Sequence, residues 1–235
     1  MVASMNLPLP RCPYMGPTIT DDNGDTPPIR MLPPDFATNP FKYLPPRYVL
    51  SEDEVDLAAR YEQGDFSRGY MQSQIAYFRR DKTLTEHANR KHRFGELKGK
   101  AARLGIVLPP ALVELVENDD YINRLRHNTV WLGFADEIVP LPSHSDHYLM
   151  LVFVEAQGCG NWHLLFAPDG SHMMALSEHG FGDSSAYPGG KQPDPSRFAV
   201  YECADSFNAW LVNYFAECVA EDAHYDRLLL QYPGQ

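Results

Sequence analysis

The fold is decided by residues 148–176, which read YLMLVFVEAQGCGNWHLLFAPDGSHMMAL. Residues 148–154 form a near-continuous apolar run, which is typical of a strand buried on both faces. Residues 161–166 and 172–176 are two further strand-like runs. Between them, Pro168-Asp169-Gly170 predicts a turn, because glycine adopts the positive φ that tight turns need. The three runs therefore predict consecutive strands of an antiparallel meander.

The sequence downstream adds a loop, a short strand and a closing helix. Residues 181–195 are rich in Gly, Pro, Ser and Asp, which predicts a surface loop, and residues 198–201 predict a further short strand. Asp205 or Ser206 is the expected cap of the last helix. The apolar positions of that helix recur at helical spacing and predict a core-facing side of Phe207, Trp210, Leu211, Tyr214, Phe215 and Cys218.

The sequence upstream predicts four helices and one more strand. Ser51 and Glu54 have the spacing of a capping box, so the first helix should begin at Ser51 and end before Gly64. Asn118-Asp119-Asp120 should end the fourth helix, after which strand-like alternation begins at residues 130–134. Because helices and strands follow one another without a βαβ rhythm, the sequence predicts the α+β class. The three remaining helices are expected at residues 67–80, 83–104 and 108–117.

Three glycines mark the third helix. Gly95 and Gly99 each weaken a helix by ~1 kcal/mol relative to alanine, so we expect a bend or break at these positions. Gly105 follows the last helical residue and is the expected C-terminal cap.

Residues 1–50 are expected to form an irregular arm. They contain eleven of the twenty prolines, which remove backbone donors and disfavour helix in the preceding residue. Two alternatives stay open for this arm: it is mobile, or it lies along the rest of the protein through Phe36, Phe41 and Tyr43. We expect extended packing, because the prolines form no clear PxxP repeat.

The sequence thereby divides the chain into a Pro-rich arm (1–50), a helical extension (51–104) and an α+β domain (105–235).

The net charge of −11 is unevenly spread along the chain. Residues 79–103 hold nine Lys/Arg and three Asp/Glu, whereas residues 104–235 hold five Lys/Arg and eighteen Asp/Glu. The acidic domain should repel nucleic acid, because DNA binding needs cations at the phosphates, and should attract a basic protein. Four interpretations of the basic segment stay open: a solvated helix face, a nucleic-acid site, a site for an acidic partner, or a helix docked on the acidic domain of the same chain.

The four cysteines are Cys12, Cys159, Cys203 and Cys218. They form no CxxC pair, so we expect reduced thiols in a cytoplasmic protein rather than a zinc ribbon or a disulfide framework. No apolar run is long enough to span a membrane, and no secretory signal is apparent at the N-terminus. The sequence also has no GxxxxGK[ST] loop, no GxGxxG after a strand and no GxSxG elbow.

Four short motifs, in order, resemble the SUKH superfamily, which includes bacterial immunity proteins and a fungal regulator of cell-wall synthesis. LPPALVEL at 108–115 is similar to the helix that opens SUKH domains, and LVFVEAQGCGNW at 151–162 to their strand, Gln-Gly turn and Trp-bearing strand. DGSH at 169–172 falls at the expected hairpin, and ADSFNAWL at 204–211 resembles the closing helix. The resemblance implies a curved antiparallel sheet flanked by helices. It also implies binding without catalysis, most commonly neutralisation of a toxin, and no cofactor. Many relatives carry Asn-Gly after the opening helix, whereas this chain has Glu117-Asn118-Asp119-Asp120 at that place.

The main functional hypothesis is therefore a non-enzymatic module that binds a basic protein partner. The candidate binding residues share either negative charge or a place beside the predicted Gln-Gly turn. They are Asp119, Asp120, Asp136, Glu137, Asp146, Glu155, Gln157 and Trp162. Core packing is the default for all three tryptophans because of the area they bury, and Trp162 is the one we expect to be partly exposed.

Two alternatives stay open. The first is a metal-dependent enzyme centred on His144, Asp146 and His147, because imidazole and carboxylate are metal ligands. That site would need a further ligand brought by the fold, from His163, His172 or His179, and a polar loop before the strand explains the three residues as well. The second is a scaffold whose contacts are made by the arm and the basic helices. A reactive Cys159 is disfavoured, since no neighbouring cation in the sequence would lower its pKa.

Overall fold

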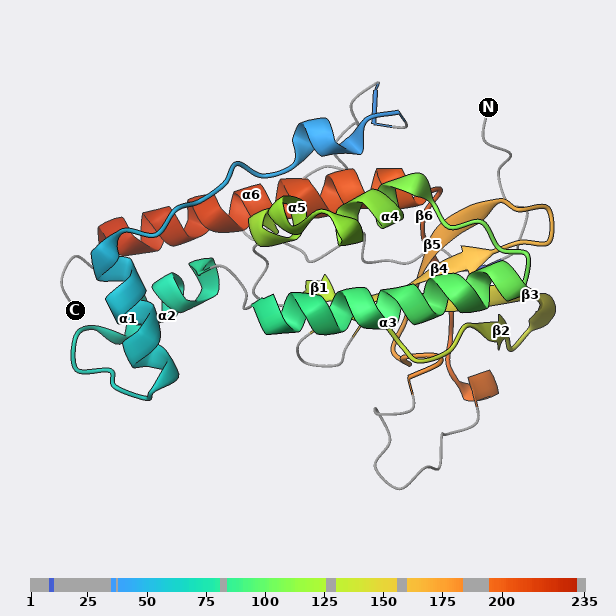
Figure 1. The fold of residues 1–235 in the computed structure, drawn as a ribbon, viewed down its shortest axis with the longest axis horizontal. Coiled ribbons are helices and arrows are strands. Elements are labelled where there is room, and N and C mark those ends of the chain that lie inside the picture. The colour runs from blue at the N-terminus through green and yellow to red at the C-terminus, as the bar shows by residue number, and fades with distance from the viewer. Residues whose placement is uncertain are drawn as a thin grey trace.

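The computed structural model describes residues 9–10, 35–36, 38–80, 84–125, 130–155, 160–183 and 195–231. In these ranges it combines six α-helices with a curved antiparallel sheet, which confirms the predicted α+β class. In Figure 1 the long helix α6 runs across the molecule, with α4, α5 and α3 beside it. The sheet lies at one end of this helical layer and the α1–α2 hairpin lies at the other.

The sheet has the order β1-β3-β4-β5-β6, and β2 also pairs with β3. Every pair is antiparallel, so the predicted meander of three central strands is confirmed. The last strand begins at Tyr201, where the predicted one ended, and the sequence analysis missed β2. The strands are β1 (Val130–Leu132), β2 (Val139–Leu141), β3 (His144–Glu155), β4 (Asn161–Phe166), β5 (His172–Ser177) and β6 (Tyr201–Ala204).

Strand β3 is longer than its apolar run. It begins at His144, because Leu141 of β2 pairs with His144 across a tight hairpin. The expectation of a polar loop at 144–147 was therefore wrong. The polar residues lie in the exposed part of the strand, beyond the core, where the hairpin partner β2 satisfies the backbone.

The helices follow the predicted order. Ser51 and Glu54 form the capping box, and the backbone N–H of Glu54 donates to Ser51 Oγ over 3.3 Å. Gly105 has a φ of +72° after the third helix, as expected of a C-terminal cap. The α-helices are α1 (Glu52–Glu62), α2 (Tyr70–Arg79), α3 (Leu84–Arg103), α4 (Pro110–Glu117), α5 (Asp119–Arg124) and α6 (Phe207–Gln231).

Two helical expectations were wrong. Helix α3 is a single helix that passes through Gly95 and Gly99; its Phe94 and Leu97 are buried in the core, and this packing outweighs the weak propensity of glycine. Residues 118–120 do not lead directly into a strand. The side chain of Asn118 accepts a hydrogen bond from Asp120 N at 3.1 Å and so caps the additional helix α5.

The main core lies between one face of the sheet and helices α3, α4, α5 and α6. Trp162 and Leu164 of β4 point into it, as does Phe215 of α6, and the whole predicted apolar side of α6 is buried. Tyr214 donates a buried hydrogen bond of 2.8 Å to the carbonyl of Val130. The predicted boundary at residue 104 falls between α3 and α4, and these two helices share this one core.

The opposite face of the sheet carries a smaller core. It contains Leu149, Leu165 and Met173 from the strands, and it is covered by Phe181 and Val200. The beginning of the predicted surface loop is therefore buried, because Phe181 fills this second core. Residues 184–194 of that loop lie outside the described ranges.

The described part of the arm lies along the helices, as predicted. A short 3-10 helix at Pro40–Tyr43 places Phe41 on Tyr121 of α5, with ring centroids 4.6 Å apart, and Tyr43 also packs against the main core. Figure 1 shows the following segment running beside α6 to the start of α1. Residues 1–8 and 11–34 lie outside the described ranges.

Candidate binding surface

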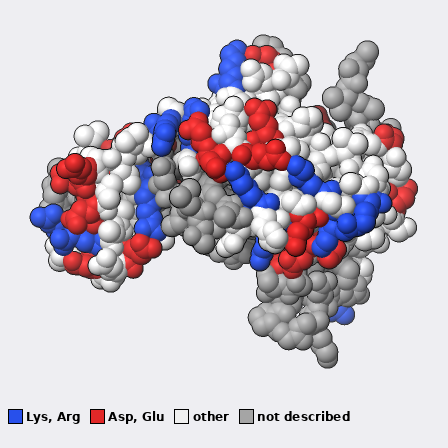
Figure 2. Space-filling model, viewed as in Figure 1, with Lys and Arg blue, Asp and Glu red and all other residues white. Residues whose placement is uncertain are grey.

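A shallow surface groove of about 870 Å³, largely open to solvent, lies over α4 and the start of α5. Leu108, Pro110 and Val113 give it apolar walls. Its polar lining is the amide of Asn118 and four carboxylates, Glu114, Glu117, Asp119 and Asp120. Figure 2 shows Asp and Glu gathered over these two helices, with Lys and Arg beside them. Two of the predicted binding residues, Asp119 and Asp120, therefore belong to one groove.

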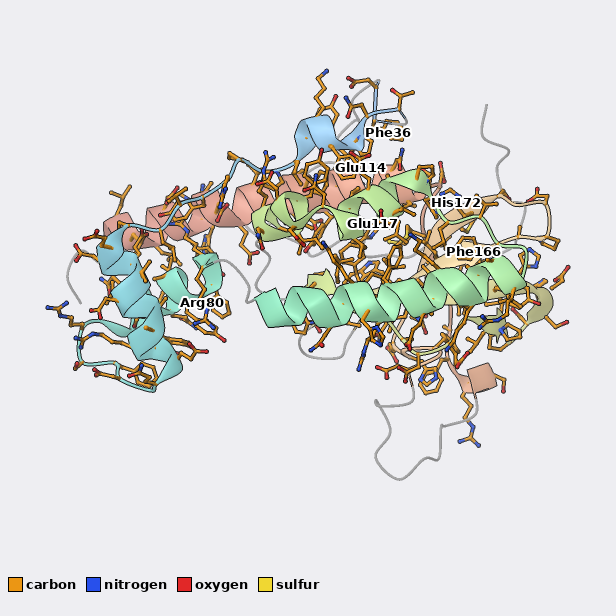
Figure 3. All side chains as sticks on the ribbon, viewed as in Figure 1. Phe36, Arg80, Glu114, Glu117, Phe166 and His172 are labelled. Carbon is orange, nitrogen blue, oxygen red and sulfur yellow. The ribbon has the colours of Figure 1, made fainter. Side chains whose placement is uncertain are left out.

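The local sequence explains why these carboxylates face solvent. Helix α4 buries Leu112 and Leu115, so Glu114 and Glu117 project from its opposite side. Figure 3 places Glu117 on the side of α4 that faces α3. Asp119 and Asp120 occupy the first turn of α5, where a negative charge interacts favourably with the helix dipole. The sequence analysis missed both glutamates, although their helical spacing opposite the buried leucines could have identified them.

Helix α3, which carries most of the basic segment, packs against this acidic surface of the same chain. Lys98 lies 2.5 Å from Glu117, and Lys91 lies 2.6 Å from Asp119. At the C-terminal half of α3, Lys100 lies 2.7 Å from Glu137 and also donates to the carbonyl of Asp136. Of the four interpretations of the basic segment, the structure supports docking on the acidic domain.

The remaining predicted carboxylates lie outside the lining of the groove. Asp146 and Glu155 lie near opposite ends of β3, nine residues apart, which is about 30 Å of extended strand. Asp146 lies 2.8 Å from His147 Nδ1, and this hydrogen bond lowers the pKa of the Asp146 carboxyl. Asp136 and Glu137 lie between β1 and β2, beside Lys100. The predicted acidic platform is therefore several separate acidic sites.

The two uncharged residues predicted to bind a partner are Trp162 and Gln157, and the structure describes only the first. Trp162 is 5% exposed and its ring lies 6.0 Å from that of Trp210, so the expectation that Trp162 is partly exposed was wrong. The reason is strand alternation: Trp162 shares its face of β4 with Leu164 and Phe166, and that face meets α6. Gln157 lies outside the described residues, as does Cys159.

The histidines considered for a metal site are dispersed. The rings of His144 and His147 lie 5.7 Å apart near Asp146, but His163 is buried against Phe181 and His179 stacks on Phe198. Within the described ranges, no three His, Cys, Asp or Glu side chains are placed to hold a metal ion together. Cys203 and Cys218 are buried in the main core, and neither forms a disulfide with another residue that the structure describes.

His163 should make the stability of the protein dependent on pH. Burial lowers its pKa to about 3, and its Nε2 accepts a 3.2 Å hydrogen bond from Phe181 N. In the unfolded chain the pKa is about 6.5, so between these values only the unfolded chain binds the proton. The free energy of unfolding should therefore fall as the pH falls below 6.5, by about 2 kcal/mol at pH 5 from this group. Urea denaturation at pH 8, 6.5 and 5 measures this loss.

The His163→Gln variant isolates this contribution, because glutamine can accept the Phe181 hydrogen bond and does not titrate. Its stability should vary less between pH 8 and pH 5 than that of the unchanged protein. His92→Gln makes the same exchange at a side chain that is 77% exposed and serves as the control. An unchanged pH dependence in His163→Gln would contradict the prediction.

No protein-family model matches the chain, and no curated protein or solved structure matches it significantly. Among the described residues, no helix has both the length and the apolar character needed to cross a membrane. What the fold and the groove define is a class: an α+β protein with an acidic, apolar-walled groove beside a basic helix of its own.

Proposed function

We propose that this protein is a non-catalytic binding module of the SUKH type, which receives a basic segment of a protein partner in the groove over α4 and α5. In its most concrete form it is an immunity protein that neutralises a basic toxin. The observation that carries the proposal is the lining of the groove, with four carboxylates around Leu108, Pro110 and Val113.

The groove combines the two features that a basic, partly apolar segment needs. Apolar walls contribute affinity when they are buried by a partner. Carboxylates at the rim accelerate encounter with a cationic surface and select against acidic partners. Glu114 is exposed and forms no ion pair with any residue that the structure describes, so its charge is available to a partner.

Helix α3 supplies an internal example of this recognition. Its lysines pair with Glu117 and Asp119 at the groove, while its apolar side packs into the core. A basic amphipathic segment of a partner would use the same chemistry at Glu114 and Asp120. The side chain of Asp120 is 49% exposed and lies 3.6 Å from Arg124, a long pair that a partner cation can replace.

The test is binding of a fluorescent amphipathic peptide of lysine and leucine at low salt. We expect the double variant Glu114→Gln/Asp120→Asn to weaken its affinity roughly tenfold, since each exposed charge pair contributes at most about 1 kcal/mol. The affinity of the unchanged protein should fall as salt rises. A peptide in which every lysine is replaced by glutamate should not bind.

The matched control is Glu52→Gln/Asp53→Asn, which removes two exposed carboxylates from the first turn of α1, away from the groove. This variant should bind like the unchanged protein. Equal losses in both double variants would mean that the peptide senses only net charge, and the groove would then be rejected as the binding site.

A further inference from the structure

A second pocket, of about 400 Å³, lies between the arm and the α1–α2 hairpin, at the end of the molecule opposite the sheet. Its volume is in the range of small-molecule sites, and it is more enclosed than the groove over α4 and α5. Most of its lining is apolar and comes from the arm and α1: Val49, Leu50, Val55, Ala58 and Ala59. Tyr48 and three arginines complete the lining: Arg47, Arg79 and Arg80.

The charge of this lining selects the class of ligand. The pocket is lined by three guanidinium groups and, among the described residues, by no carboxylate. The groove over α4 and α5 has the opposite character, with four carboxylates in its lining. Because apolar walls and cationic groups meet at one small space, the complementary ligand is an anion that carries an apolar body.

Aromatic rings hold two of these guanidinium groups in place. The guanidinium carbon of Arg80 lies 4.5 Å from the centroid of the Tyr77 ring, and that of Arg79 lies 4.6 Å from the centroid of the Tyr48 ring. A charged group that is already ordered loses little conformational freedom when a ligand binds. The cationic side of the pocket is therefore preorganised for an anion.

Arg79 keeps one hydrogen-bond donor for which the described residues supply no acceptor. Its side chain is 1% exposed, and its buried Nε makes no hydrogen bond with any of them. Asp222 Oδ1 lies 3.7 Å from this nitrogen, which is an ion-pair distance but too long for a hydrogen bond. A buried donor without an acceptor is destabilising, so a ligand that brings an acceptor into the pocket gains affinity from it.

Arg80 indicates which anion fits. It binds the carboxylate of Glu62 in a two-pronged arrangement, at 2.6 and 3.0 Å, which is the geometry that guanidinium and carboxylate groups share. The side chain of Glu62 is 54% exposed, so this pair contributes little to stability and another carboxylate can take its place. One negative charge on the ligand then balances the charge of Arg80.

We propose that this pocket binds a small monocarboxylate with an apolar chain, such as a medium-chain fatty acid. Its carboxylate accepts hydrogen bonds from Arg80 and from Arg79 Nε, and its chain lies against Val55 and Ala59. The pocket is separate from the groove over α4 and α5, and this site does not depend on the function proposed for that groove.

Isothermal titration calorimetry of the full chain with octanoate tests the proposal. We expect octanoate to bind roughly tenfold more tightly than 1-octanol, which has the chain without the charge. It should also bind roughly tenfold more tightly than hexanoate, because each buried methylene changes the affinity about fourfold.

Two variants of the hairpin test the cationic side. Arg80→Gln should weaken octanoate binding roughly fivefold and leave 1-octanol binding unchanged. The matched control is Arg68→Gln, which removes an exposed arginine from the α1–α2 loop, outside the lining of the pocket. This control should bind octanoate like the unchanged chain.

Filling the pocket tests its apolar side. Ala59→Phe should abolish octanoate binding, and Ala59→Leu repeats the test if urea denaturation shows that Ala59→Phe folds poorly. Octanoate should slow hydrogen exchange in α1 and α2 of the unchanged chain only. The proposal would be overturned by no binding at millimolar octanoate, by equal binding of octanoate and 1-octanol, or by equal effects of Arg80→Gln and Arg68→Gln. Undiminished binding by the filled variants, or protection outside these two helices, would overturn it as well.

Discussion

Replacing Gly182 with alanine should destabilise the protein by about 2–5 kcal/mol. Gly182 has a φ of +82°, which costs an alanine roughly 1–2 kcal/mol. An added Cβ would also lie 2.2 Å from the carbonyl oxygen of Glu137, so the backbone has to move, at a further cost of about 1–3 kcal/mol. The same residue joins two loops, because its carbonyl accepts 3.1 Å hydrogen bonds from the N–H groups of Asp136 and Glu137.

Gly170→Ala is the control that separates the two costs. Gly170 has nearly the same φ, +84°, but no atom lies within 4 Å of an added Cβ. Urea denaturation should therefore show a loss of only about 1–2 kcal/mol for Gly170→Ala, from backbone strain alone. A Gly182→Ala variant as stable as Gly170→Ala would show that the contact with Glu137 does not constrain the fold.

Replacing Arg79 with methionine should lower the free energy of unfolding by about 3 kcal/mol. It should also loosen the attachment of the α1–α2 hairpin to α6. The Arg79 side chain is 1% exposed and its Nη2 donates to Asp226 at 2.7 Å and to the carbonyl of Asp222 at 2.8 Å. Nη1 lies 3.2 Å from the hydroxyl of Tyr48, whose ring lies beneath the guanidinium. One side chain thus joins α2, the arm and α6, and its replacement leaves the carbonyl of Asp222 and the hydroxyl of Tyr48 without this charged donor.

Arg80→Met is the adjacent control. Arg80 forms a two-pronged pair with Glu62, at 2.6 and 3.0 Å, on the surface of the hairpin (Figure 3 labels Arg80). An exposed pair contributes at most about 1 kcal/mol, so this variant should be close to the unchanged protein in urea denaturation. Hydrogen exchange in α1 and α2 should rise in Arg79→Met only. Equal exchange in both variants would contradict the role assigned to Arg79.

Local sequence signals were sufficient for most of the helices and the central strands. The capping box at Ser51 and Glu54, the apolar run at 148–154 and the spacing of apolar residues on α6 each depend on neighbours in the chain, and each is found where it was predicted. Helix α5 was missed because Asn118 both ends one helix and caps the next. Strand β2 was missed because three residues including Pro140 carry no apolar periodicity.

The candidate binding surface depended on contacts between distant segments. The sequence identified Asp119 and Asp120 as carboxylates near the end of a helix, but it could not show that Lys91 of α3 would pair with Asp119. For Trp162, the sequence allowed either face of the strand, and only the position of α6 decided that the ring is buried.

By itself, the sequence determined the α+β class, the antiparallel meander and the strong division between a basic helix and an acidic domain, because periodicity and charge are local properties of the chain. The tertiary structure alone decided that these opposite charges meet within the molecule and that four carboxylates share one groove. Each of these depends on which distant segments pack together, and that is set by the burial of one shared core.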